Sequence, residues 1–226
     1  MASDLPELAP LIDHALLDPH QGREAVQRCC DEARHFGFAG VCVASRWVGL
    51  ARERLPLQGS GRGALPKLIS VVGFPFGAVP AAVKRAEAEW AAQAGADELD
   101  VVPDFGALAD GDSGAVLADL AAICELGLPV KVILEAARLS PEALELLVEI
   151  SIDAGARFLK SGSGFGPPVT ADAVRRLRQL ARGRAAVKAS GGIADLEQAY
   201  ALVEAGASRL GTSRGVALIE ALRNRA

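Results

Sequence analysis

Aromatic residues are scarce in this chain, where they make up 4% of the sequence, and histidines number only three. His14, His20 and His35 all stand near the N-terminus and do not repeat at the spacing of metal ligands, which argues against a histidine-based metal site. The four cysteines are either adjacent or far apart, without the spacing of zinc ligands. We therefore expect no metal and no other cofactor, and we expect reduced thiols, as in a cytoplasmic protein.

The sequence also has no apolar run that approaches the roughly 18 residues of a membrane span. Its first residues carry neither the basic region nor the apolar core of a signal peptide. The net charge is −4, and the charged residues are scattered rather than gathered into a basic patch. These absences predict a cytoplasmic protein whose partners are small molecules rather than nucleic acid or membrane.

What the chain has instead is apolar residues, which make up 50% of its 226 residues and can bury a large core. Short apolar runs alternate with helical patterns, and glycine or proline separates many of them. The predicted strands cover 11–17, 39–43, 67–72, 98–102, 130–135, 157–160, 185–189 and 208–212. The predicted helices cover 22–36, 47–54, 80–94, 115–125, 140–154, 170–182, 195–205 and the end of the chain. The glycine-rich stretch 58–63 is predicted to be a loop.

Strand–helix units that recur roughly every 25–30 residues predict a (β/α)8 TIM barrel, an α/β fold that residues 1–226 form as a single domain. Near-repeats around Gly95, Gly155 and Gly206 mark three of the turns that lead from a helix to a strand. A doubly wound open sheet is the alternative. It fits less well, because no glycine-rich fingerprint follows the first strand and 162–166 is only a loose glycine loop.

Two lysines and an aspartate stand near the C-terminal ends of three predicted strands, where TIM barrels carry their active sites: Lys160, Lys188 and Asp100. Strand alternation allows all three side chains to point into the barrel at its C-terminal end. A single lysine at such a place usually extends its amine to the solvent at the edge of the sheet, but the presence of a second lysine favours a catalytic role. A neighbouring cation such as Lys188 favours the neutral form of an amine, so Lys160 is predicted to attack a carbonyl carbon. Asp100 is predicted to move protons, directly or through water.

Lys131 and Glu135 share a face of the fifth predicted strand by the same alternation. We expect a charged pair beneath the site. Its role is open between orienting the two lysines and serving only as a buried structural ion pair.

Glycine-rich turns follow the seventh and eighth predicted strands and lead into helices, an arrangement that often holds phosphate in TIM barrels. The candidate phosphate ligands there are Gly191, Gly192, Gly211, Thr212, Ser213 and Arg214. Gly164, in the loop that follows Lys160, is a further candidate for substrate binding. The alternative is that these glycines serve only the geometry of tight turns.

Taken in order, several stretches between Ile12 and Gly215 resemble the deoxyribose-phosphate aldolase family. They are 12–14, 16–17, 41–43, 71–75, 95–102, 131–135, 158–160, 187–189, 191–193 and 211–213. The family consists of class I aldolases, which join acetaldehyde to glyceraldehyde 3-phosphate through a lysine Schiff base. The resemblance implies that Lys160 forms the Schiff base, that Lys188 is the second lysine and that Asp100 relays protons. It also implies supporting roles for Cys42, Lys131 and Glu135, aldehyde and phosphosugar substrates, and a homodimer.

The chain departs from the family pattern in the loops around these residues. Ser161-Gly162-Ser163-Gly164 stands for Thr-Ser-Thr-Gly, Ala136-Ala137 for Thr-Gly, Ala44-Ser45 for Asn-Pro, Ala194 for Arg and Arg214 for Ser. We hypothesise that Arg214 replaces the lost arginine in phosphate binding. Two alternatives stay open: a divergent Schiff-base aldolase with another, unphosphorylated acceptor, and a barrel that binds or isomerises a phosphosugar without a covalent intermediate.

Overall fold

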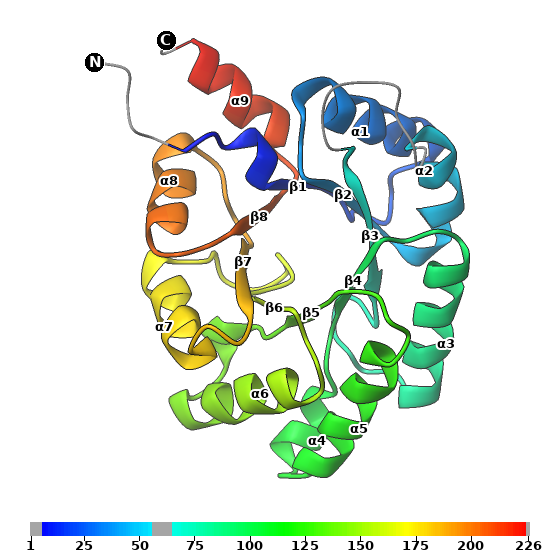
Figure 1. Ribbon diagram of the computed structural model, residues 1–226, viewed down its shortest axis with the longest axis vertical. Helices are drawn as coiled ribbons and strands as arrows, with labels where there is room; N and C mark the ends of the chain where they lie inside the picture. The colour runs from blue at the N-terminus through cyan, green and yellow to red at the C-terminus, as the bar shows by residue number, and fades with distance from the viewer. Residues whose placement is uncertain (1–5, 56–64, 225–226) are drawn as a thin grey trace.

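The computed structural model describes residues 6–55 and 65–224, which form a closed barrel of parallel strands surrounded by helices (Figure 1). The strands pair in sequence order, and the last strand closes the barrel against the first. They are β1 (Ile12–Leu16), β2 (Gly40–Val43), β3 (Lys67–Val72), β4 (Glu98–Val101), β5 (Val130–Ile133), β6 (Phe158–Lys160), β7 (Ala186–Ser190) and β8 (Arg209–Thr212). The predicted (β/α)8 barrel is confirmed, and the open doubly wound sheet is wrong. The loop predicted at 58–63 lies outside the described residues.

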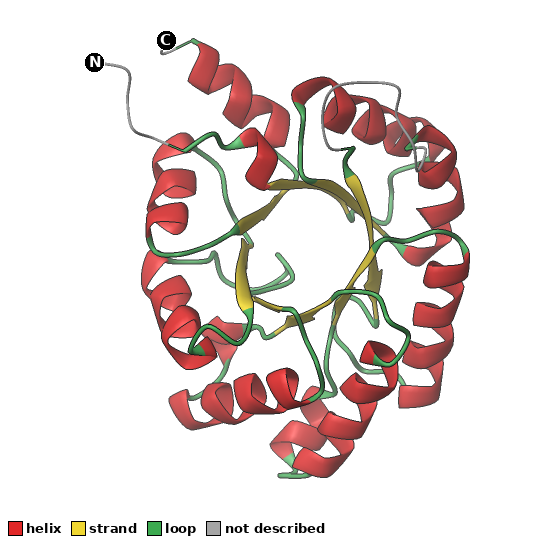
Figure 2. Ribbon diagram, viewed as in Figure 1, coloured by secondary structure: helices red, strands yellow, loops and turns green. Residues whose placement is uncertain are grey.

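The helices form an outer layer around the strands (Figure 2). They are α1 (Arg23–Phe36), α2 (Val48–Arg54), α3 (Ala81–Gln93), α4 (Phe105–Ala109), α5 (Ser113–Cys124), α6 (Pro141–Asp153), α7 (Ala171–Ala181), α8 (Leu196–Glu204) and α9 (Gly215–Arg223). Short 3-10 turns occur at η1 (Ala9–Leu11), η2 (Ser45–Trp47) and η3 (Ala136–Arg138). Helix α9 contacts both α8 and α1, so it completes the outer ring (Figure 1). Each helix in the described ranges is too short or too polar to cross a membrane.

Local capping signals explain why several helices begin or end where the sequence predicts. Ser140, Thr170 and Asp195 each accept a hydrogen bond from the backbone N–H three residues later, at the starts of α6, α7 and α8. These bonds satisfy N–H groups that the first helical turn leaves without partners. Gly37 ends α1 in the left-handed conformation, at φ 70°, which costs glycine little.

Two local predictions differ from the structure. Helix α4 was not predicted; Asp104 caps it by accepting a hydrogen bond from the N–H of Ala107. Strand β5 is shorter than predicted, because it ends at Ile133 and the backbone of Glu135 turns into the left-handed region, at φ 48°. Strand alternation stops where the strand stops, so Lys131 and Glu135 do not share a face.

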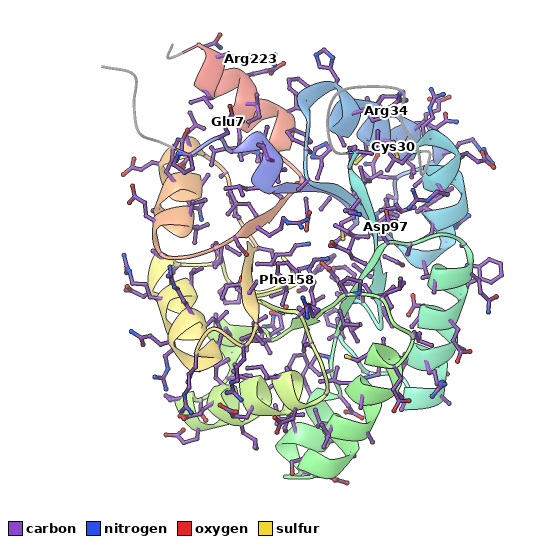
Figure 3. All side chains as sticks on the ribbon, viewed as in Figure 1. Glu7, Cys30, Arg34, Asp97, Phe158 and Arg223 are labelled. Carbon is purple, nitrogen blue, oxygen red and sulfur yellow. The ribbon has the colours of Figure 1, made fainter. Side chains whose placement is uncertain are left out.

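The main apolar core is formed by residues of both strands and helices, and a separate small cluster consists of Cys42, Ile69 and Val71, with Ala15, Leu17 and Phe74 packed against it. Phe158, labelled in Figure 3, lies inside the ring of strands and contacts two cationic side chains. Buried charges occupy much of the remaining interior. The strand register places Asp100 beside Lys131 and Lys160 beside Lys188, and ion pairs from both Lys160 and Lys188 to Asp100 join the two pairs.

Candidate active site

The structure brings the two predicted lysines and the predicted aspartate together inside the barrel. Lys160 on β6 and Lys188 on β7 are register partners, and Asp100 lies across the barrel on β4. The Nζ atoms of both lysines donate to the same oxygen, Oδ2 of Asp100, over 2.9 and 2.8 Å. Asp100 is 0% exposed and Lys160 3% exposed. One carboxylate oxygen therefore serves two ammonium groups in a site with little access to water.

Lys131 contacts the other carboxylate oxygen of Asp100. Its Nζ donates to Asp100 Oδ1 over 2.9 Å and lies 2.6 Å from Oε2 of Glu98, which is two residues before Asp100 on β4. The predicted ion pair between Lys131 and Glu135 is wrong. Lys131 finds its carboxylates on the neighbouring strand, in register, whereas Glu135 lies beyond the end of β5.

Two further charged residues belong to the site and were not assigned a role from the sequence. Oδ2 of Asp13, on β1, lies 2.6 Å from Nζ of Lys188, and Oδ1 of Asp13 accepts from Arg209 over 2.6 Å. Asp13 is 0% exposed. The available signal was a charged residue within a short strand, since Asp13 and Arg209 both stand inside predicted strands of a barrel.

The charges of this cluster hold Asp100, Asp13 and Lys188 in their ionised forms. Burial on its own raises the pKa of Asp100, but Lys131, Lys160 and Lys188 outweigh it and keep that pKa well below its usual range. The pKa of Asp13 is lowered in the same way, mainly by Lys188 against the opposing effect of burial. Burial lowers the pKa of Lys188, but Asp100 and Asp13 reverse this and raise it overall. Lys188 is therefore a fixed cation at neutral pH.

Cys42 on β2 contacts the same aspartate, because its Sγ donates to Oδ2 of Asp100 over 3.9 Å. Burial and, next, the charge of Asp100 raise the pKa of this thiol to about 11. The thiolate is the nucleophilic form of cysteine, so Cys42 is not poised to attack a substrate at neutral pH. All four cysteines are free thiols.

A cavity of about 580 Å³ opens above the lysines and is large enough for a small metabolite. Lys160, Lys188 and Cys42 line it, together with loops that follow β1, β6, β7 and β8. It also includes the whole predicted phosphate set and the predicted substrate contact: Gly164, Gly191, Gly192, Gly211, Thr212, Ser213 and Arg214. Asp100, Lys131 and Glu135 do not line it. The cavity is thus lined both by the side chains of Lys160 and Lys188 and by glycine-rich turns.

The turn after β7 needs glycine for conformational and steric reasons. Gly191 and Gly192 both have positive φ, at 106° and 70°, and a Cβ on Gly192 would lie 2.8 Å from Pro168 Cβ. The turn after β8 is held by Thr212, whose Oγ1 accepts from the N–H of Arg214 over 3.0 Å and donates to the carbonyl of Ile193 over 3.1 Å. These bonds join the two turns that lead into the N-termini of α8 and α9, where the helix dipoles favour an anion.

Comparisons with known proteins agree with this arrangement. The sequence is 46% identical over 221 residues to a deoxyribose-phosphate aldolase of Thermosynechococcus vestitus, and the alignment covers 96% of this chain and 98% of that protein. It is 44% identical over 223 residues to a deoxyribose-phosphate aldolase of Thermococcus gammatolerans, covering 96% of this chain and 97% of that one. No protein-family model matches the sequence. The chain belongs to the deoxyribose-phosphate aldolase family.

A solved structure supports the assignment to the deoxyribose-phosphate aldolase family at the level of the fold. The deoxyribose phosphate aldolase of Aeropyrum pernix, described as having a unique tetrameric structure, matches with a TM-score of 0.85 at 36% identity. The match covers 97% of this chain and 92% of that chain. The resemblance that the sequence motifs predicted is therefore confirmed over nearly the whole chain.

Three of the residues that depart from the family pattern, Ser163, Ala194 and Arg214, line the cavity, and none of the departures belongs to the buried charge cluster. Ser161 bonds the ends of β6 and β7 together, since its Oγ donates to the carbonyl of Ser190 over 3.0 Å and accepts from the N–H of Ser190 over 2.9 Å. The N–H of Ala194 donates to Oε1 of Gln198 over 2.9 Å. Arg214 is exposed at the cavity rim. Ser161 thus joins the ends of the two strands that carry Lys160 and Lys188, and Arg214 adds a side-chain cation at the cavity rim.

Glu135 lies beside the loop that follows Lys160 rather than beneath the lysines. Its Oε1 accepts from the N–H of Ser163 over 2.5 Å, and its Oε2 lies 3.9 Å from Nε of Arg138. It borders a second, smaller cavity of about 230 Å³ with Phe165 and other apolar side chains. Glu135 therefore shapes the loop at the mouth of the site and makes no contact with the charge cluster.

Proposed function

We propose that this chain is a class I aldolase that reversibly cleaves 2-deoxy-D-ribose 5-phosphate to acetaldehyde and D-glyceraldehyde 3-phosphate through a Schiff base on Lys160. The observation that carries the proposal is the shared oxygen of Asp100. Lys160 lines the cavity, and its ion pair with Asp100 uses the same Oδ2 atom that pairs with Lys188. An amine without a carboxylate of its own, beside a fixed cation, is the one that most readily becomes a neutral nucleophile.

The other two buried lysines suit the nucleophilic role less well. Lys188 lines the cavity but is paired with both Asp13 and Asp100, and its pKa is raised. Lys131 is 0% exposed, pairs with Glu98 and Asp100, and does not line the cavity. Their proposed roles are therefore electrostatic: Lys188 keeps a positive charge beside Lys160, and Lys131 holds Asp100 in place.

In the direction of synthesis, the neutral amine of Lys160 attacks the carbonyl carbon of acetaldehyde, and loss of water gives an imine. The protonated imine withdraws electrons, so a proton leaves the methyl carbon and an enamine forms. The enamine carbon attacks the aldehyde carbon of glyceraldehyde 3-phosphate, and that aldehyde oxygen takes up a proton. Water then hydrolyses the imine and frees Lys160. Asp100 is ionised at neutral pH, so its proposed role is to accept and return protons, directly or through water.

We place the phosphate of the substrate between the turns that follow β7 and β8. The backbone of Gly191 and Gly192, and the turn from Gly211 to Ser213, face the cavity at the N-terminal ends of α8 and α9. Arg214 supplies a side-chain cation at the rim, where it compensates for Ala194. An Arg214→Ala variant should raise KM for the phosphorylated substrate about tenfold with little change in kcat, since one charge-assisted bond is lost. An unchanged KM would remove Arg214 from the phosphate site.

The deciding experiment traps the imine. The protein is incubated with acetaldehyde and borohydride, and the reduced adduct is mapped by mass spectrometry. We expect a two-carbon adduct on Lys160, and we expect none at that position in a folded Lys160→Met variant. A folded wild-type protein that cleaves deoxyribose 5-phosphate without any adduct at Lys160 would disprove the assignment of the nucleophile. Tight phosphosugar binding by a protein that forms no adduct would instead support the non-covalent barrel.

A second candidate is an aldolase of the same mechanism with an unphosphorylated acceptor. The observation in its favour is the N–H of Ala194, which bonds Gln198 at the position where the family pattern has an arginine. A panel of acceptor aldehydes separates the two. The first candidate predicts a higher kcat/KM for glyceraldehyde 3-phosphate than for glyceraldehyde, and the second predicts the reverse.

We further propose that the chain works as one catalytic domain, that it forms a homodimer and that it acts in the cytoplasm. Free cysteines suit a reducing compartment. The homodimer is suggested by the family resemblance, whereas the structure of the Aeropyrum pernix relative is described as a tetramer. Light scattering after gel filtration gives the mass of the assembly in solution, and a monomer or tetramer would correct the prediction.

A further inference from the structure

The charged residues inside the barrel form a closed ring of alternating sign. In order around it they are Arg209, Asp13, Lys188, Asp100, Lys131 and Glu98, after which Glu98 meets Arg209 again. Five of the six contacts measure 2.6–2.9 Å, and the sixth, between Glu98 Oε1 and Arg209, measures 3.8 Å. We call these six residues the charge ring. Its members come from β1, β4, β5, β7 and β8, so barrel closure is what completes it.

The charge ring is balanced without Lys160. It contains three carboxylates, two ammonium groups and one guanidinium group, and every member has two neighbours of opposite charge within it. Lys160 is attached from outside, through Oδ2 of Asp100, which Lys188 already contacts. A protonated Lys160 therefore adds one uncompensated positive charge to a buried cluster, and a neutral Lys160 adds none.

We propose that Glu98 and Arg209 are positioning residues that set the net charge of this ring and thereby set the pH at which Lys160 becomes a neutral nucleophile. The inference rests on the proposed function, because it takes Lys160 to be the amine that forms the imine. Neither residue lines the cavity. Each acts through other members of the ring: Arg209 through Asp13 and Lys188, and Glu98 through Lys131 and Asp100.

The surroundings of Lys160 leave few other groups to control its charge. Within the described residues, the charged group in contact with it is Asp100, with Lys188 and Lys131 on the same carboxylate. Cys42 also faces the cluster, but its thiol is neutral near pH 7 because its pKa is raised to about 11. The ring of Phe74 lies 6.0 Å from Nζ of Lys160 and carries no charge. Glu135, beyond the end of β5, bonds the N–H of Ser163.

Among the six residues of the charge ring, Glu98 and Arg209 can lose their charge with the least loss of packing around Lys160. Their side chains are 9% and 16% exposed, and their mutual contact is the longest in the ring. The centroid of the Phe158 aromatic ring lies 5.7 Å from the guanidinium carbon of Arg209 and 5.8 Å from Nζ of Lys131. This aromatic contact holds both cations in position if one carboxylate is neutralised.

The test compares pH profiles of imine formation, measured as the initial rate of the borohydride-trapped adduct on Lys160 with acetaldehyde. Glu98→Gln removes a negative charge, so Lys160 loses its proton more readily and the midpoint moves to lower pH. Arg209→Met removes a positive charge, so the midpoint moves to higher pH. We expect shifts of about half a pH unit or more in opposite directions. The double variant restores the balance and should return close to the wild-type midpoint.

Arg209→Lys is the matched control, because it keeps the charge and should keep the midpoint. A purely structural role predicts lower rates for the single variants at all pH values with unchanged midpoints, and that result would overturn the proposal. If Glu98→Gln does not fold, the comparison of Arg209→Met with Arg209→Lys decides between the two outcomes. If Lys160 of the wild-type protein forms no adduct at any pH, the proposed function itself fails. Adduct formation with unshifted midpoints would instead contradict only the proposal about the charge ring.

Discussion

Two buried clusters of lysine and aspartate can be compared in this molecule. Outside the barrel, Lys84 of α3 pairs with Asp119 of α5 and also donates to the carbonyl of Val102 over 3.3 Å. Lys84 is 0% exposed and Asp119 5% exposed. Inside the barrel, Lys160 is just as deeply placed but shares the one oxygen it contacts with Lys188. Similar residues at similar burial thus differ in whether each lysine has its own carboxylate.

The pKa values of the two aspartates, Asp119 and Asp100, are shifted in opposite directions. Burial raises the pKa of Asp119, and the hydrogen bond and charge of Lys84 do not fully offset that effect. Burial also acts on Asp100, but three lysines reverse it and lower the pKa. The comparison suggests that a one-to-one pair joins helices, whereas an excess of cations around one carboxylate leaves one amine free to react.

The largest expected effect comes from removing the shared carboxylate. Asp100→Asn keeps the shape of the side chain but leaves Lys131, Lys160 and Lys188 with one carboxylate fewer and removes the proposed proton acceptor. We expect kcat for deoxyribose 5-phosphate cleavage to fall about 10²–10⁴-fold. Steady-state kinetics measure this, and circular dichroism checks that the variant is folded. Activity close to wild type would show that catalysis does not depend on the shared carboxylate of Asp100.

Breaking the outer pair should instead affect stability. Lys84→Met leaves Asp119 buried and unpaired, so the free energy of unfolding should fall by about 3–5 kcal/mol. The kcat of the folded fraction should stay near wild type, because neither residue lines the cavity. Urea denaturation and kinetics give the two quantities. The double variant Lys84→Met with Asp119→Leu serves as the control and should recover most of the stability, since both charges are gone. A large kcat loss in the single variant would erase the distinction between the clusters.

Acid should weaken the inner cluster. The pKa values of Asp100 and Asp13 are lowered in the folded protein, so the unfolded chain binds protons more readily at low pH. The stabilisation is present above the ordinary aspartate value of about 3.9 and is lost as pH falls below it toward the folded pKa. Urea denaturation at pH values from about 5 to 2 should show falling stability. An Asp13→Asn variant should start lower and show a shallower fall; an equally steep fall would exclude Asp13 as a source.

The smallest effect is expected from Cys42, which contacts Asp100 without bringing a charge. Cys42→Ala removes one long hydrogen bond from a neutral thiol, so we expect a loss of about 1 kcal/mol in stability and a change in kcat of less than about threefold. Thermal unfolding and steady-state kinetics measure both. A loss of activity as large as that of Asp100→Asn would mean that contact with Asp100, rather than charge, is what matters.

Much of this molecule could be predicted from local patterns. Periodicity and capping residues such as Ser140 and Thr170 place the helices, because a cap bonds backbone groups only three residues away. Strand alternation correctly placed Lys160, Lys188 and Asp100 inside the barrel, since a side chain's face depends only on its position in the strand. Helix α4 and the bend at Glu135 were missed, because short elements and strand ends carry weak signals.

The sequence by itself determined that Lys160, Lys188 and Asp100 face the barrel interior, because alternation within a strand decides the face of a side chain locally. The tertiary structure alone decided which charged residues meet. Asp13 and Arg209 are 196 residues apart in the chain and come within 2.6 Å because β1 closes against β8. Lys131 contacts Glu98 and Asp100 rather than Glu135, because partners are set by register across neighbouring strands. Alternation specifies a face, whereas an ion pair needs a distance, and distances between strands exist only once the barrel is closed.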